Sequence, residues 1–219
     1  MQTLFQPIVT TLLDELFRDA ERTDAPLMAQ LHAMPADERG ALMADYKRLY
    51  GAAKDAYLPI SRAAGVLLYT LARARDARLI VEFGTSFGVS TIFLAAALRD
   101  AGGGRLITSE LEPSKAARAK ANLERAGLAD LVELRVGDAL DTLADVRGPI
   151  DLVYLDGAKA LYRPILDRLE PGLADRAVIV ADNIDMVEQV ESYTSHVRDP
   201  AQGYVSTRVN DLEISLRIR

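Results

Sequence analysis

The chain has 219 residues, 49% of them hydrophobic, and its 32 acidic and 26 basic residues give a formal net charge of −6. This length and composition fit one domain with a sizeable core, expected to span residues 1–219, and the lack of cysteine excludes disulfides, thiolate zinc sites and cysteine nucleophiles. Because the chain has no basic block and no apolar stretch long enough to span a bilayer, we expect a cytoplasmic protein that binds neither nucleic acid nor membranes.

The pattern of residues 1–75 predicts a helical N-terminal extension. Between residues 4 and 17, pairs of apolar residues recur every fourth position and form one stripe on an α-helix. This stripe could pack on the core or against a second copy of the chain, and both interpretations stay open. Two prolines within residues 24–40 predict short helices or loops there, and longer helices are expected over 41–56 and 60–75.

From residue 76 onwards, short apolar runs alternate with helical segments. This order is typical of an α/β fold with a doubly wound, mostly parallel sheet that is covered by helices on both faces. Near the C-terminus, two further runs flank Asn210 and Asp211, a pair that tolerates a tight turn, and they predict an antiparallel hairpin. The expected strands cover residues 79–83, 105–109, 131–136, 150–155, 177–181, 204–209 and 212–218.

In such a sheet the ligand binds outside the carboxyl ends of the strands, so the loop after the first strand is a candidate site. Gly84 and Gly88 allow a sharp turn and a close approach of a ligand, and the helix that starts near Ser90 favours an anionic group. The glycine spacing differs from the Gly-x-Gly-x-x-Gly pattern of nicotinamide-binding loops, which argues against that cofactor. The alternative is that the glycines only make a tight turn.

Acidic residues follow the second and third strands. Glu110 comes directly after the second strand, where an acidic side chain can accept both hydroxyl hydrogens of a ribose, although a solvated surface carboxylate is the alternative. Asp138 follows the third strand, where it could cap the next helix or bind the adenine end of a nucleoside.

The ends of the fourth and fifth strands carry the most informative residues. Parallel neighbouring strands would bring Asp156, Asp182 and Asn183 together, and their oxygens are ligands that a hard cation such as Mg²⁺ prefers. Lys159 lies near a helix start, where the dipole disfavours a positive charge, so we expect it to face an anionic group. The alternative is that these side chains are helix caps, loop contacts and a solvated lysine.

Together, these five motifs resemble in order those of cation-dependent O-methyltransferases, a family that includes catechol and caffeoyl-coenzyme A O-methyltransferases. The match covers about residues 60–183 and implies a Rossmann-like methyltransferase domain with 76–219 as its cofactor-binding core. The matching motifs are the loop from Glu82 to Ser90, Glu110, Gly137-Asp138-Ala139, Asp156-Gly157-Ala158-Lys159, and Asp182-Asn183.

The resemblance also implies S-adenosylmethionine and Mg²⁺, or another divalent cation such as Mn²⁺ or Ca²⁺, as cofactors. It places Ser90 near the methionine carboxylate, and Asp138 and Ala139 beside the adenine. The implied cofactor-binding residues are Glu82, Gly84, Thr85, Ser86, Ser90, Glu110, Asp138, Ala139 and Asp156. The implied metal ligands are Asp156, Asp182 and Asn183, and the implied catalytic residues are Lys159 and Asp156.

The expected activity is methyl transfer from S-adenosylmethionine to a hydroxyl oxygen of a small, catechol-like or phenolic aromatic acceptor. Gly157 and Ala158 are smaller than the residues often found at these positions, and the helical extension matches no substrate-binding region, which leaves the acceptor open. A nicotinamide-dependent oxidoreductase and a non-catalytic small-molecule-binding protein on the same fold are the alternatives. By resemblance we also expect a homodimer, with the N-terminal helices forming either an interface or a lid.

Overall fold

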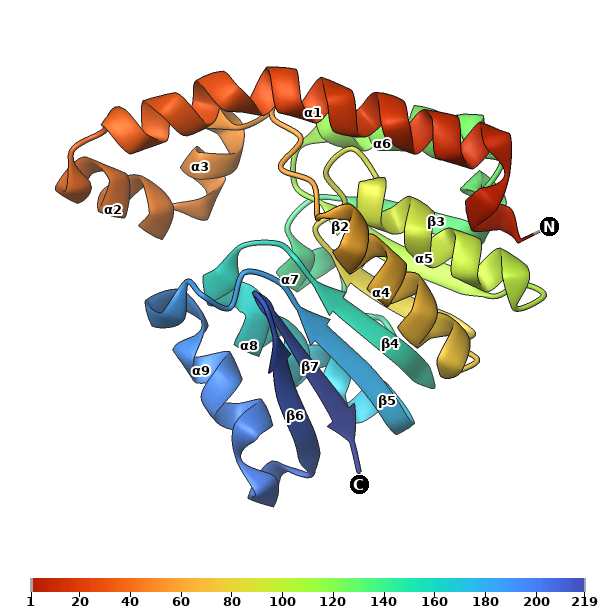
Figure 1. Cartoon of the computed structure of the whole chain (residues 1–219). Coiled ribbons are helices and arrows are strands. Elements are labelled where there is room, and N and C mark those ends of the chain that lie inside the picture. The colour runs from red at the N-terminus through yellow and green to blue at the C-terminus, as the bar shows by residue number, and fades with distance from the viewer. Residues whose placement is uncertain (1, 219) are drawn as a thin grey trace.

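A central seven-stranded sheet organises the protein in the computed structural model, which describes residues 2–218 apart from the side chains of Ala36, Met43 and Ala44. The strands are β1 (Leu79–Phe83), β2 (Arg105–Glu110), β3 (Val132–Val136), β4 (Ile150–Leu155), β5 (Leu173–Ala181), β6 (Tyr204–Val209) and β7 (Leu212–Arg217). Their order is β3-β2-β1-β4-β5-β7-β6 (Figure 1). Only β7 runs antiparallel to its neighbours β5 and β6, so the expected mostly parallel sheet with a C-terminal hairpin is confirmed.

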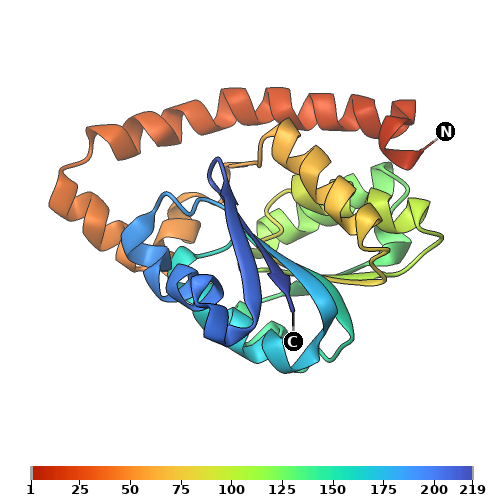
Figure 2. The ribbon, with the colours of Figure 1, turned by 60° about the horizontal axis from the view of Figure 1, so that its bottom comes forward.

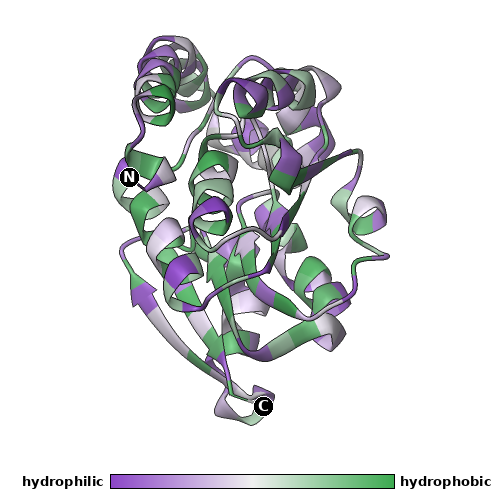
Figure 3. Ribbon diagram, turned by 90° about the vertical axis from the view of Figure 1, so that its right-hand side faces the viewer, coloured by the Kyte–Doolittle hydropathy of each residue, from purple (hydrophilic) through white to green (hydrophobic). Residues whose placement is uncertain are grey.

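The alternation of side chains along the strands builds a core on each face of the sheet. In β1, Ile80 packs into one core while Val81 and Phe83 pack into the other. Figure 3 shows hydrophobic residues concentrated in the strands and in the helices packed on them. One face is covered by α4 (Arg62–Ala74), α5 (Val89–Asp100) and α6 (Pro113–Arg125), and the other by α7 (Ala139–Thr142), α8 (Tyr162–Leu169) and α9 (Val187–Arg198).

The N-terminal extension is helical, as expected, but its boundaries differ from the prediction. A 3-10 turn, η1 (Thr3–Phe5), precedes α1 (Pro7–Ala33), which continues through Pro26. The short helices or loops expected over residues 24–40 therefore begin only after Ala33. Asp24 explains part of this difference, because its carboxylate accepts the N–H groups of Tyr57 at 2.6 Å and Leu58 at 2.7 Å and holds the helix against the rest of the protein. The buried apolar stripe of α1 packs on the sheet-covering helices, which supports its core-facing interpretation.

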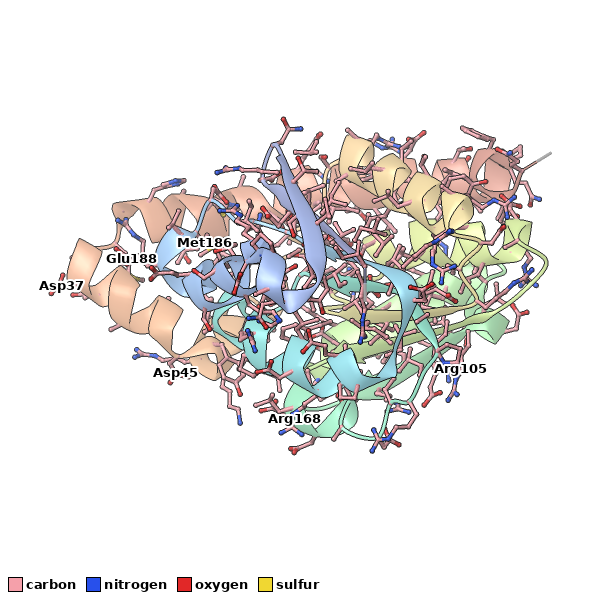
Figure 4. The ribbon with its side chains drawn as sticks, turned by 90° about the horizontal axis from the view of Figure 1, so that it is seen from below. Asp37, Asp45, Arg105, Arg168, Met186 and Glu188 are labelled. Atoms are coloured by element: carbon pink, nitrogen blue, oxygen red, sulfur yellow. The ribbon has the colours of Figure 1, made fainter. Side chains whose placement is uncertain are left out.

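The helix expected over 41–56 is two helices. They are α2 (Ala36–Ala44) and α3 (Tyr46–Ala52), and Asp45 separates them by capping α3 with a hydrogen bond from the Arg48 N–H, 3.1 Å long. Figure 2 shows α1 extending beyond the sheet before the chain turns back through α2. In Figure 4, Asp37 and Asp45 at the ends of α2 lie on the opposite side of the molecule from Arg105 at the start of β2. The α2-α3 segment therefore lies on the side of the strands' carboxyl ends. Within residues 2–218, no helix combines the length and the apolar character needed to cross a membrane.

Candidate active site

The loop between β1 and α5 makes a turn that only glycine accommodates at its first position. Gly84 has φ +104°, and a Cβ there would lie 2.7 Å from the carbonyl oxygen of Asp156. Gly88, with φ +86°, immediately precedes α5. The loop thus packs directly against the end of β4, and the two sequence motifs that suggested a cofactor and a cation are adjacent in space.

Glu82, at the end of β1, lies in a buried cluster of hydroxyl groups. Its carboxylate accepts hydrogen bonds of 2.7 Å from Ser90, Thr91 and Thr108, and Thr108 also bonds Thr85 at 2.6 Å. Burial raises the pKa of Glu82 to about 7 despite these three hydrogen bonds. Ser90, expected beside the methionine carboxylate, directs its hydroxyl towards Glu82 in this structure.

Glu82→Gln is expected to weaken the dependence of stability on pH. Because the folded-state pKa of about 7 exceeds the ordinary value of 4.5, the folded protein binds more protons than the unfolded chain between these values. The free energy of unfolding therefore falls as pH rises from about 4.5 to about 7, with this group contributing up to about 3 kcal/mol. Urea unfolding at pH 5 and pH 8 measures the effect, and exposed Glu191→Gln is the matched control. An unchanged pH dependence in Glu82→Gln would contradict this assignment.

Glu110, at the end of β2, is held by backbone N–H groups. Ser86 donates to one carboxylate oxygen at 2.7 Å and Glu112 donates to the other at 2.9 Å. The side chain is buried, and this burial raises its pKa. Each carboxylate oxygen has a second lone pair, so Glu110 can still accept hydrogen bonds from the hydroxyl groups of a ribose.

Asp138 both caps a helix and contacts the N-terminal extension. Its carboxylate accepts the N–H of Leu140 at 3.1 Å at the start of α7, as the helix-capping interpretation expects. The same carboxylate accepts a 2.8 Å hydrogen bond from the Tyr46 hydroxyl and lies 3.2 Å from the Lys47 ammonium group. Helix α3 is thereby fastened at the end of β3, beside buried Ala139.

Tyr50 extends this cover towards the other acidic residues. It lies one turn after Tyr46 on α3, and burial together with the charges of Asp156 and Glu110 raises its pKa. Sequence reasoning named neither tyrosine, although two aromatic residues four positions apart share one face of a helix. The α3 helix accordingly covers the carboxyl ends of the strands, which supports the lid interpretation of the extension.

Asp156 and Asp182 come together at the ends of β4 and β5. The pairing of Leu155 with Ala181 places the two following aspartates side by side. Their Oδ2 atoms lie 3.1 Å and 3.2 Å from the same oxygen, the hydroxyl of Tyr154. Burial, and then the charge of Asp156, raises the pKa of Asp182 to about 7.

Asn183 follows Asp182 in a left-handed conformation with φ +52°, and its N–H donates to Asp182 Oδ1 at 2.7 Å. Asp156, Asp182 and Asn183 thus follow the ends of two neighbouring strands, and their carboxylate and amide oxygens are a donor set that suits Mg²⁺. The part of the chain that the structure describes contains no group of three or more His, Cys, Asp or Glu suited to a metal, and the present set has only two such members. The donor atoms that these three side chains offer to a cation are oxygens, which are the ligands that a hard cation prefers.

Lys159 faces an anionic group, as its position near a helix start suggested. Its Nζ lies 3.1 Å from Asp156 Oδ1 and 2.9 Å from the hydroxyl of Tyr162, which donates in turn to the Asp182 carbonyl at 3.0 Å. The Lys159 side chain is 11% exposed. Tyr154 and Tyr162 were not named from the sequence, because a tyrosine within an apolar strand or helix carries no signal that its hydroxyl contacts a site.

Comparisons with known proteins identify the family of the chain. A family model described as a methyltransferase domain matches residues 81–184. The chain is 43% identical over 129 residues to a catechol O-methyltransferase of Mycobacterium tuberculosis, which covers 58% of this chain and 57% of that protein. It is 39% identical over 155 residues to a catechol O-methyltransferase of Niastella koreensis, with 67% of each chain covered. The chain thus spans little more than half the length of the first relative and two thirds of the second.

Solved structures extend the similarity to most of the chain. The O-methyltransferase TomG from Streptomyces achromogenes, involved in tomaymycin synthesis and solved in complex with S-adenosylmethionine, is 28% identical with a TM-score of 0.68. That match covers 92% of this chain and 99% of TomG, including the N-terminal extension in part. The sequence motifs, the strand order and these relatives agree, and the chain belongs to the class I S-adenosylmethionine-dependent O-methyltransferase family.

Proposed function

We propose that this protein transfers the methyl group of S-adenosylmethionine to a hydroxyl oxygen of a small catechol-like or phenolic acceptor, and that the reaction requires Mg²⁺ or another divalent cation. The observation that carries this proposal is the convergence of Asp156 and Asp182 beside Lys159, directly against the Gly84 turn. Two relatives named catechol O-methyltransferase support the acceptor class. Membership of the family sets aside the nicotinamide-dependent alternative.

Each group at the strand ends has a proposed task. The Gly84 turn and Glu110 would bind the cofactor, the latter through its ribose, and Asp138 with Ala139 would lie beside the adenine. Asp156, Asp182 and Asn183 would hold the cation. A bound divalent cation would lower the pKa of a phenolic hydroxyl, which is ordinarily about 10, and orient it.

Lys159 is the group proposed to act on the acceptor. Its Nζ would either take the hydroxyl proton as a general base or, as a cation, favour the anionic oxygen. The methyl carbon would bond to that oxygen as its bond to the cofactor sulfur breaks. Asp156 and Tyr162 fix the amine between them and restrict where it can reach.

Methyl transfer from labelled S-adenosylmethionine to a panel of vicinal diphenols and other phenols tests the proposal. We expect labelled product with at least one vicinal diphenol, loss of product in EDTA, and recovery when excess Mg²⁺ is added. Undiminished product in EDTA would contradict the cation requirement, and the absence of product across the panel would contradict the acceptor class. We also propose that the protein is a homodimer and that it is cytoplasmic. Size-exclusion chromatography with light scattering measures the oligomeric state.

A further inference from the structure

Tyr154 lies at a position that the proposed reaction does not use. On β4, side chains two residues apart point to the same face, so Tyr154 and Asp156 share one face of the sheet. On β5, Val180 pairs with Tyr154, which puts Asp182 on that same face. Tyr154 is fully buried, and its ring packs in the core beneath the two carboxylates.

The Tyr154 hydroxyl contacts both aspartates. It lies 3.1 Å from Asp156 Oδ2 and 3.2 Å from Asp182 Oδ2, and it is the one side chain of residues 2–218 with hydrogen bonds to both carboxylates. The other two carboxylate oxygens accept from the Lys159 amine and the Asn183 N–H. The Tyr154 hydroxyl lies against the remaining oxygen of each carboxylate and donates its one proton to either of them, so it links one strand end to the other.

We propose that Tyr154 is a positioning residue of the cation site, whose hydroxyl sets the spacing and orientation of Asp156 and Asp182. The inference rests on the proposed function, because it presupposes that these aspartates hold a cation. Two like-charged groups without a shared donor separate, whereas a cation needs its ligands to converge before it binds. A hydroxyl between them supplies a donor to either carboxylate while leaving the second lone pair of each oxygen for the cation.

Tyr154→Phe removes the hydroxyl and keeps the ring, so the buried packing is retained. The matched control is Tyr193→Phe, the same change at a fully buried tyrosine on α9. Binding of Mn²⁺ is followed by electron paramagnetic resonance of the free ion, in the presence of saturating S-adenosylhomocysteine. Thermal unfolding in EDTA and calorimetric titration with S-adenosylhomocysteine report on the fold and on the cofactor pocket of each variant.

We expect Tyr154→Phe to weaken Mn²⁺ binding about 10- to 100-fold, with S-adenosylhomocysteine affinity within about twofold of wild type. Tyr193→Phe should change neither quantity. Mn²⁺ affinity in Tyr154→Phe that equals or exceeds that of the wild type would overturn the positioning role while leaving the proposed function in place. A wild-type protein that does not bind Mn²⁺ would overturn both.

Discussion

Replacing Lys159 with methionine is expected to lower kcat about 100- to 10,000-fold, the range typical of a lost proton-transferring group. Methionine matches the aliphatic stem of lysine in length but lacks the amine that lies between Asp156 and Tyr162. The dissociation constant for S-adenosylmethionine should stay within about twofold, because the amine has no contact with the Gly84 turn or Glu110 among the hydrogen bonds of the site. Single-turnover methyl transfer and calorimetric titration measure the two quantities.

Two companion variants make this result specific. Lys120→Met removes an exposed lysine on α6 and should leave both quantities unchanged. Lys159→Arg keeps the charge without an amine that readily releases its proton, so partial recovery of kcat would indicate a charge role and full loss a general base. A kcat for Lys159→Met within threefold of wild type would remove this lysine from the proposed chemistry.

Asp182→Asn is expected to abolish nearly all activity, with or without added Mg²⁺. The change leaves one carboxylate at the proposed site, and losing a Lewis acid costs several kcal/mol of transition-state stabilisation, which is a fall in kcat/KM of about a thousandfold or more. The same change should raise the free energy of unfolding at pH 8 in EDTA. Burial and the charge of Asp156 raise the pKa of Asp182 to about 7, so the ionised side chain destabilises the folded protein above that pH, and asparagine carries no such charge.

Asp185→Asn, an exposed change in the same loop, is the control for both measurements. Methyl transfer with increasing Mg²⁺ and urea unfolding at pH 8 in EDTA separate the effect on the reaction from the effect on stability. An Asp182→Asn protein that is fully active in EDTA would show that the cation site is wrongly assigned. Lower stability of this variant at pH 8 would contradict the raised pKa.

The sheet could be predicted from the sequence because its strands are continuous apolar runs separated by helical segments. The strands over residues 79–83, 150–155 and 204–209 agree with the structure at both ends, and β5 differs most, beginning at Leu173 instead of residue 177. The extra residues of β5 include exposed Asp175 and Arg176, so they have no apolar pattern that would extend the predicted strand.

The N-terminal extension was harder to predict because tertiary contacts, rather than local preference, decide its boundaries. Pro26 suggested a break, yet α1 continues beyond it while Asp24 bonds the backbone of Tyr57 and Leu58. The position of α3 depends on a contact between Tyr46 and Asp138, which are 92 residues apart. No local pattern in the sequence encodes such a contact.

In the candidate site, too, some residues could be predicted from local sequence patterns and others depend on tertiary contacts. Residues at strand ends were accessible to prediction, because parallel strands bring their carboxyl ends together and Asp156, Asp182 and Lys159 needed only that rule. The tyrosines that hold them were not, since the hydroxyl of Tyr154 reaches the carboxylates only through the register of β4 with β5. The orientation of Ser90 towards Glu82 likewise depends on burial.

Anomalous diffraction from crystals grown with Mn²⁺ and S-adenosylhomocysteine tests most directly whether the ends of β4 and β5 hold a cation. We expect one strong anomalous peak there, with oxygens of Asp156, Asp182 and Asn183 about 2.0–2.4 Å from the ion. A structure with cofactor bound in which these three side chains point apart and no anomalous peak lies among them would contradict this expectation.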